Sequence, residues 1–258
     1  MQIGFSQRVQ LGWLEHTAAL VLAGQPRAQI ETALQACLHD KLSIGGTARR
    51  GNREKAITIL LKIWVSVPPW LQPLRDDGLS YLQRLPHADH LAVHWGMTMA
   101  AYPFFGAVAE TVGRLMRLQS TCAAAQIQRR IREHLGERET VARAARRILR
   151  CLVDWGVLQE TREKGVYQAS PARPVPDKQL AAWLIEAALL AQGTDTGVMQ
   201  TVLQTPALFP FGMPRLYAAD LEDQGRIAIF RQGLDEDMVI LRRAETPRHQ
   251  GGGAAVSQ

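Results

Sequence analysis

The chain has 258 residues, of which 47% are hydrophobic and 21% charged, and its formal net charge is +6 at pH 7. This composition excludes a chain too polar to bury a core, and the length suits one large domain or two to three small ones. The excess positive charge favours a polyanionic partner. No run of 18 uninterrupted apolar residues occurs, so we expect no membrane span and no membrane partner.

Cysteine usage indicates a reducing, cytoplasmic location. Cys37, Cys122 and Cys151 lie far apart without a C-x-x-C pair, which predicts neither a disulfide framework nor a zinc knuckle. The N-terminal run "LGWLEHTAALVLAG" is broken by Glu15 and His16, so it predicts an amphipathic helix rather than a signal peptide.

Hydrophobic periodicity predicts a helical bundle over residues 1–118. The pair Pro68-Pro69 ends the strongly apolar third helix, and Pro103 suits the first turn of the sixth. The predicted helices cover residues 7–23, 26–39, 52–67, 71–85, 88–101 and 103–119.

Residues 119–170 follow the order of a winged helix-turn-helix. A short helix over 122–135 precedes a longer one over 139–154, which Gly156 caps. The segment "LQETREKGVYQAS" then predicts a hairpin that turns at Gly165 and forms the wing. The longer helix would be the recognition helix, and its apolar stripe consists of Val141, Ala145, Ile148, Leu149 and Leu152.

Beyond the proline-rich linker "SPARPVP", residues 177–243 predict a small α+β segment. It contains a helix over 178–192 and a hairpin made of "GRIAIFRQG" and "DEDMVILRR". Residues 244–258 are too small and polar to pack, so we expect a disordered tail. The predicted fold class is therefore mainly α, with a bundle, a winged helix-turn-helix and this small segment.

The positive charge is concentrated in one short stretch. Residues 126–150 contain eight arginines and three glutamates, a net +5 of the +6 carried by the whole chain. If the apolar stripe faces inward, the arginines of the longer helix face outward, with Glu139 and Asp154 as the acids near its ends. Like charges on one face repel each other, so an external anion such as DNA is expected.

A helix-turn-helix reads bases with the N-terminal residues of its recognition helix, so Arg138, Thr140 and Arg143 are the candidates for base contact. Arg162 and Lys164 at the wing tip are expected to reach the flanking DNA backbone or minor groove. Phosphate contacts are expected from Arg129, Arg130, Arg132, Arg146, Arg147 and Arg150. A merely solvated basic helix and a protein-binding winged helix are the alternatives.

A second phosphate contact is a further hypothesis. The stretch "GGTARRGN" has the glycine spacing of a phosphate-binding loop but lacks its lysine and hydroxyl residue, which argues against nucleotide hydrolysis. A glycine-rich helix entry can still bind a backbone phosphate, and a flexible basic loop is the alternative. The side chains concerned are Arg49, Arg50, Arg53 and Lys55.

No enzyme, cofactor or metal site is predicted. His90 and His94 are spaced i, i+4 on one face, with His87 one turn earlier, a pattern that can chelate a metal. The one nearby carboxylate, Asp89, points to another face, so hydrogen-bonded imidazoles on a half-exposed helix are favoured. The sequence also has no Gly-x-Ser-x-Gly nucleophile motif.

Three stretches resemble one protein family over roughly residues 40–160: "TARR" followed by "REKAITILLKIW", then "YPFFGAVAETVGRL", then "RETVARAARRILRCLVDWGVL". Their layout resembles the BrxA-type, NusB-like accessory proteins of BREX phage-defence systems. The resemblance implies a non-catalytic component that binds double-stranded DNA, beside other subunits of a defence complex. A transcriptional regulator bound to an operator, or an adaptor for protein assembly, are the alternatives.

Overall fold

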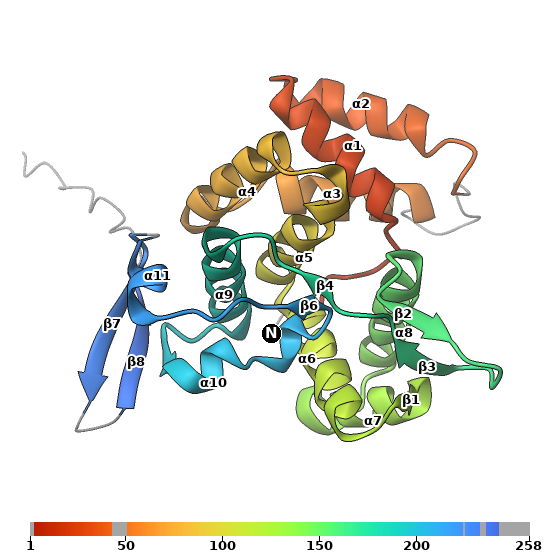
Figure 1. Ribbon diagram of the computed structural model, residues 1–258. Coiled ribbons are helices and arrows are strands. Elements are labelled where there is room, and N and C mark those ends of the chain that lie inside the picture. Colours follow the sequence, from red (N-terminus) through yellow and green to blue (C-terminus); the bar gives the residue numbers. More distant parts are fainter. Residues whose placement is uncertain (1–2, 43–50, 224, 233–235, 243–258) are drawn as a thin grey trace, which may run out of the picture.

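The computed structural model describes residues 3–42, 51–223, 225–232 and 236–242, and this part of the chain is mainly α-helical with three small sheets (Figure 1). Its N-terminal half consists of helices that match the predicted ones to within four residues at each end. They are α1 (Leu11–Leu22), α2 (Arg27–Cys37), α3 (Asn52–Trp64), α4 (Gln72–Arg84), α5 (His90–Ala101) and α6 (Pro103–Leu118), with the short 3-10 helices η1 (Pro69–Leu71) and η2 (His87–Asp89) between them.

Helix α5 lies at the centre of the bundle because it is mostly apolar and has no charged face. All its residues from Leu91 to Ala101 are buried. The ring of Trp95 in α5 packs edge-on against the rings of Phe105 and Trp155, with 5.1 Å and 6.2 Å between the ring centroids. The indole N–H of Trp95 donates to the carbonyl of Ala207 at 3.1 Å. Segments far apart in the sequence thus share one core.

Helix α9 (Lys178–Gln192) belongs to the same core and packs along α5. The Asp177 side chain caps its start by accepting a hydrogen bond from the Leu180 N–H at 2.7 Å, and Gly193 ends it with φ of 70°. Trp183 donates from Nε1 to the carbonyl of Leu74 at 3.0 Å. Its ring lies directly against Gly96, so a side chain there would collide with it. A helix that the sequence placed in the C-terminal segment therefore packs in the bundle.

The C-terminal hairpin predicted from the sequence is confirmed as β7 (Ile227–Gln232) paired antiparallel with β8 (Glu236–Leu241). A strand that the sequence did not reveal, β5 (Thr196–Val198), joins the other edge of β8. The hairpin projects from the body at one end of the molecule (Figure 1). The remaining elements here are β4 (Arg173–Pro174), α10 (Met199–Leu203), η3 (Pro206–Leu208), β6 (Phe211–Gly212) and α11 (Ala218–Glu222).

Two predictions fall on residues outside the described part of the chain. They are the tail over 244–258 and most of the loop "KLSIGGTARRGN". Among the described helices, no single one combines the length and apolar character needed to cross a membrane. Only the pair formed by Asn52–Trp64 and Pro69–Arg84, bent by 64°, reaches that threshold when taken together.

Candidate nucleic-acid interface

The basic stretch belongs to a compact unit that follows α6. Its elements are β1 (Thr121–Ala123), α7 (Ala124–Leu135), α8 (Glu139–Asp154), β2 (Leu158–Glu160) and β3 (Val166–Ala169). The three strands form one antiparallel sheet in the order β1-β3-β2. Strand β1 was missed by the sequence reasoning, since three residues leading into a helix carry no alternation of their own. It is held by β3, where Cys122 pairs with the buried Tyr167.

The two helices of this unit bury the residues that their periodicity indicated. Ile127 and Ile131 of α7 are buried, and Gly136 ends this helix with φ of 91°, which allows the chain to turn sharply into α8. The predicted stripe of α8 is confirmed, because all five of its members are buried. Ala144 and Cys151 join them, so the apolar face is broader than predicted. The charged residues of α8 are thereby confined to the remaining surface.

The C-terminal end of α8 is fastened to the segment before α1. Trp155 donates from Nε1 to the carbonyl of Val9 at 2.9 Å, and the Val9 N–H donates to the thiol of Cys151 at 3.2 Å. Arg8 lies 3.1 Å from the carboxylate of Asp154. Asp154 therefore forms its ion pair with Arg8, although it also lies within electrostatic reach of Arg150 of α8.

Acidic side chains lie within 4 Å of several α8 arginines, for which the sequence predicted an external anion. Arg143 lies 2.8 Å from Glu139, Arg146 lies 3.9 Å from the same carboxylate, and Arg150 lies 4.0 Å from Glu160 of β2. One carboxylate thus serves two guanidinium groups, and a positive excess remains. These contacts are exposed, so each contributes at most about 1 kcal/mol.

Arg147 differs from its neighbours because its side chain is half-buried rather than exposed. Burial, together with the charges of Arg143 and Arg146, lowers the pKa of Arg147. Burial is the larger cause of this lowering, and the two like charges add to it, so three guanidinium groups lie near one another on this side of α8. Among the described residues, Arg147 has no acidic side chain within 4 Å.

Helix α7 repeats this arrangement on its exposed side. Arg129 and Arg130 share the carboxylate of Glu133, at 3.8 Å and 3.6 Å. Arg132 and Arg138 are exposed, and neither has an ion-pair partner in the part of the chain that the structure describes. Both helices therefore present more guanidinium groups than carboxylates.

The N-terminal end of α8 carries the candidates for base contact. Arg138 is the residue before the first turn and adopts an extended backbone, with φ of −78° and ψ of 136°. Thr140 and Arg143 follow it, and all three side chains are exposed. They therefore occupy the end of the helix at which a helix-turn-helix reads bases, and this role stays a prediction.

The β2–β3 hairpin carries its cations at the tip. The Thr161 N–H donates to the carbonyl of Val166 at 2.9 Å, and the Val166 N–H donates to the carbonyl of Glu163 at 3.1 Å, which closes the turn. Gly165 supplies the positive φ of 78° that this turn requires. Arg162 and Lys164 are exposed within it. Figure 1 shows the hairpin projecting outward beside α8.

The second predicted phosphate contact is only partly within the described chain. Arg49 and Arg50 lie outside it. Arg53 donates to the carbonyls of His39 at 2.7 Å and Leu42 at 3.5 Å. The N–H of Gly51 donates to the Glu54 carboxylate at 3.2 Å, and Lys55 is half-buried. The chain's own groups thus occupy donors that a phosphate would need.

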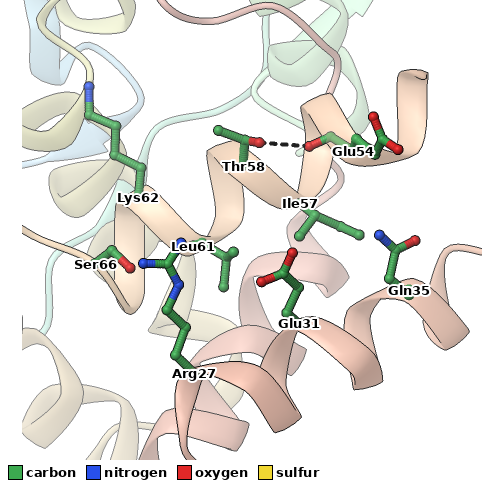
Figure 2. A pocket seen from close by; sticks show the side chains of 9 residues that line it. All are labelled: Arg27, Glu31, Gln35, Glu54, Ile57, Thr58, Leu61, Lys62 and Ser66. Carbon is green, nitrogen blue, oxygen red and sulfur yellow. Dashed lines mark hydrogen bonds between the residues drawn. The ribbon is translucent and has the colours of Figure 1, made fainter. Parts of the chain in front are cut away.

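A groove of about 440 Å³ between α2 and α3 contains charges of both signs (Figure 2). Arg27 and Glu31 point from α2 toward α3, whereas Lys62 points away from them. The Lys62 ammonium lies 4.4 Å from the centroid of the Tyr102 ring, and burial lowers its pKa. Two carboxylates and two cations line this groove, so it offers no net field to a polyanion.

The exposed cations of α7, α8 and the β2–β3 hairpin therefore form the candidate interface, which we call the basic surface. Its functional assignment depends on this geometry alone. Comparison of the chain with protein-family models, with curated proteins and with solved structures gives no match.

Proposed function

We propose that this protein binds duplex DNA without catalysis, through a winged helix-turn-helix formed by residues 119–170, which contain β1 to β3. The observation that carries the proposal is the order β1-α7-α8-β2-β3 together with the strand order β1-β3-β2. In a winged helix, this order places the second helix of the pair on the outside with a hairpin beside it. Here that helix is α8, whose exposed arginines form part of the basic surface.

The charges of the basic surface suit a phosphate backbone. Glu133 and Glu139 each meet two arginines, so both helices retain an excess of positive charge. An exposed ion pair contributes at most about 1 kcal/mol, so a guanidinium group can exchange its carboxylate for a phosphate at little cost. Each such exchange also releases a counterion from the DNA, which favours binding at low salt.

In the proposed complex, the N-terminal end of α8 enters the major groove. Arg138 and Arg143 are the side chains whose forked guanidinium groups suit guanine, and Thr140 lies between them. Arg162 and Lys164 contact the flanking backbone or minor groove. The remaining arginines of α7 and α8 contact phosphates and fix the orientation of the protein on the duplex.

Titration of a labelled duplex at several salt concentrations tests the proposal. The variant Arg143/Arg146/Arg150→Ala removes three exposed cations of α8. We expect binding to weaken at least about tenfold and the salt slope to fall by about 2 to 3 units. The matched control is Arg27/Arg215/Arg242→Ala, which removes the same charge from exposed positions elsewhere and should change the slope little.

Equal weakening of DNA binding by both triple variants would show that affinity depends only on the net charge of the protein. That result would contradict the assignment of the basic surface as the binding site. Absence of duplex binding near 100 mM salt would contradict DNA binding and favour the assembly adaptor. A preference for one palindromic operator would favour the transcriptional regulator. On the resemblance to BrxA-type proteins, we propose that the complex serves a BREX-like phage-defence system, for which loss of phage resistance in the α8 variant is the test.

A further inference from the structure

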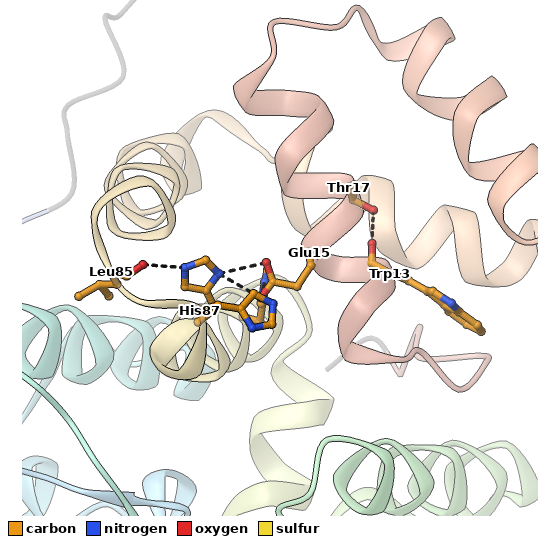
Figure 3. Close-up of polar contacts among 7 residues, drawn as sticks. Trp13, Glu15, Thr17, Leu85 and His87 are labelled. Carbon is orange, nitrogen blue, oxygen red and sulfur yellow. Dashed lines mark hydrogen bonds and ion pairs between the residues drawn. The ribbon is translucent and has the colours of Figure 1, made fainter.

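Three metal-ligating side chains meet at the surface between α1 and the start of α5. Glu15 of α1 points toward His87 of η2 (Figure 3), and its carboxylate also contacts His90, the first residue of α5. Both Glu15 oxygens lie 3.1 Å from His90 Nδ1, and Oε1 lies 3.6 Å from His87 Nε2. One ligand atom from each residue lies within 4.8 Å of the other two. Glu15 therefore supplies the carboxylate that the histidine pattern lacked.

These distances suit a small transition-metal ion. Zinc binds imidazole nitrogen and carboxylate oxygen at about 2.1 Å, so neighbouring ligand atoms in a tetrahedral site are about 3.4 Å apart. The contacts of 3.1 Å and 3.6 Å from Glu15 to the two imidazoles lie on either side of that value. A site with two nitrogen ligands and one oxygen ligand favours zinc and its neighbours over magnesium or calcium.

The imidazole of His90 is oriented as in known metal sites. Its Nδ1 faces Glu15, while its Nε2 lies 3.0 Å from the carbonyl of Leu85. That carbonyl can accept the Nε2 proton, so Nδ1 is the nitrogen that can bind a metal ion, once it gives up the proton that it would otherwise donate to Glu15. A metal-ligating histidine commonly donates its second N–H to a backbone carbonyl in this way, which fixes the tautomer and the ring plane.

His94 provides an independent observation, because it is a fully buried imidazole aimed at the same carboxylate. Its exposed fraction is 0%, and its Nε2 lies 3.2 Å from Glu15 Oε1. Glu15 is thus the acidic partner of His94 Nε2, whereas Nδ1 has no hydrogen-bond partner among the described residues. Because His94 is buried and cannot turn toward solvent, its contact fixes the orientation of the Glu15 carboxylate that faces His87 and His90.

We propose that Glu15, His87 and His90 bind one divalent transition-metal ion such as Zn²⁺, with His94 positioning the carboxylate. The His87 side chain is 80% exposed, so the ion enters from that side and a water molecule completes its coordination. The ion would join α1 to the central helix α5. Without the ion, the residues of the site connect these two helices through the hydrogen bonds and ion pairs of Glu15.

The test uses the full chain without a histidine tag. Calorimetry measures Zn²⁺ binding, and the visible absorption spectrum of bound Co²⁺ reports the coordination number. We expect one ion per chain and a four-coordinate Co²⁺ spectrum. His87→Ala should weaken binding at least about tenfold, and its exposed position makes misfolding a minor concern. Glu15→Gln should do the same while keeping the side-chain shape.

His16→Ala is the matched control, because His16 is exposed on α1 next to Glu15 but outside the cluster. This variant should bind Zn²⁺ and Co²⁺ as the parent does. Binding of less than one ion per chain would overturn the proposal, as would binding that survives both His87→Ala and Glu15→Gln. In either case the cluster is a set of carboxylate–imidazole pairs only. DNA binding by the basic surface does not depend on this outcome.

Discussion

Arg226 holds Glu186 with two parallel hydrogen bonds, from Nε to Oε1 at 2.7 Å and from Nη2 to Oε2 at 2.9 Å. Glu186 is a residue of α9 with an exposed fraction of 3%, and Arg226 directly precedes β7. Burial raises the pKa of Glu186, and the bonds from Arg226 oppose that rise. Arg226 also contacts Asp77 of α4, so one guanidinium group joins three elements.

Arg226→Ala should destabilise the protein by about 3 kcal/mol, because it leaves the buried Glu186 carboxylate without its partner. Urea denaturation followed by circular dichroism measures the change. Arg117→Ala removes an exposed arginine from α6 and should shift the free energy of unfolding by no more than about 0.5 kcal/mol. Equal effects of the two substitutions would show that the pair does not stabilise the fold.

Gly113→Ala should also destabilise the protein, even though alanine favours helices. A Cβ at Gly113 of α6 would collide with the carbonyl oxygen of Pro206 in η3. Such overpacking costs about 1 to 3 kcal/mol, more than the gain of up to about 1 kcal/mol from replacing a helical glycine. Nothing lies within 4 Å of the position that a Cβ would occupy at Gly12 of α1, so Gly12→Ala should be neutral or stabilising. Thermal melts of both variants measure the two changes. A stabilised Gly113→Ala would contradict the close packing of α6 on η3.

One thiol should react quickly in the native protein, and two only after unfolding. Burial raises the pKa of Cys122 to about 11 and that of Cys151 to about 12. At pH 8, at most about one in a thousand of these thiols is ionised, and the thiolate is the nucleophile. Cys37 is partly exposed. A disulfide reagent with a coloured product measures both phases, and Cys37→Ser should abolish the fast one. A fast phase that persists in this variant would contradict the burial of the other two.

Glu139→Gln should tighten DNA binding severalfold at low salt, because it frees Arg143 and Arg146 and removes a negative charge from the basic surface. The same substitution should cost a few tenths of a kcal/mol in stability, since Glu139 is the acidic residue in the first turn of α8. Fluorescence anisotropy with a labelled duplex measures the affinity. Weaker binding by Glu139→Gln would indicate that this carboxylate positions Arg143 for contact and does not merely compete with the phosphate.

The sequence alone determined the helices of the N-terminal half, the buried stripe of α8 and the C-terminal hairpin. These features are periodic over neighbouring residues, so spacing alone reveals which positions face the core. Val141 and Ile148 are buried because they recur on one side of a single helix, and Arg143 and Arg150 are exposed for the same reason. Gly156 and Gly165 likewise have the positive φ values that their local sequences required.

Only the tertiary structure decided which distant residues meet. Glu15 and His90 form a hydrogen bond although they are 75 positions apart in the sequence, and Arg226 and Glu186 do so at a separation of 40. Local periodicity of the sequence predicts neither contact. Strand β1 exists because β3 supplies its hydrogen bonds, and α9 reaches the core because Gly96 leaves room for Trp183. Such contacts depend on how elements pack, which is a property of the whole chain rather than of any short stretch of it.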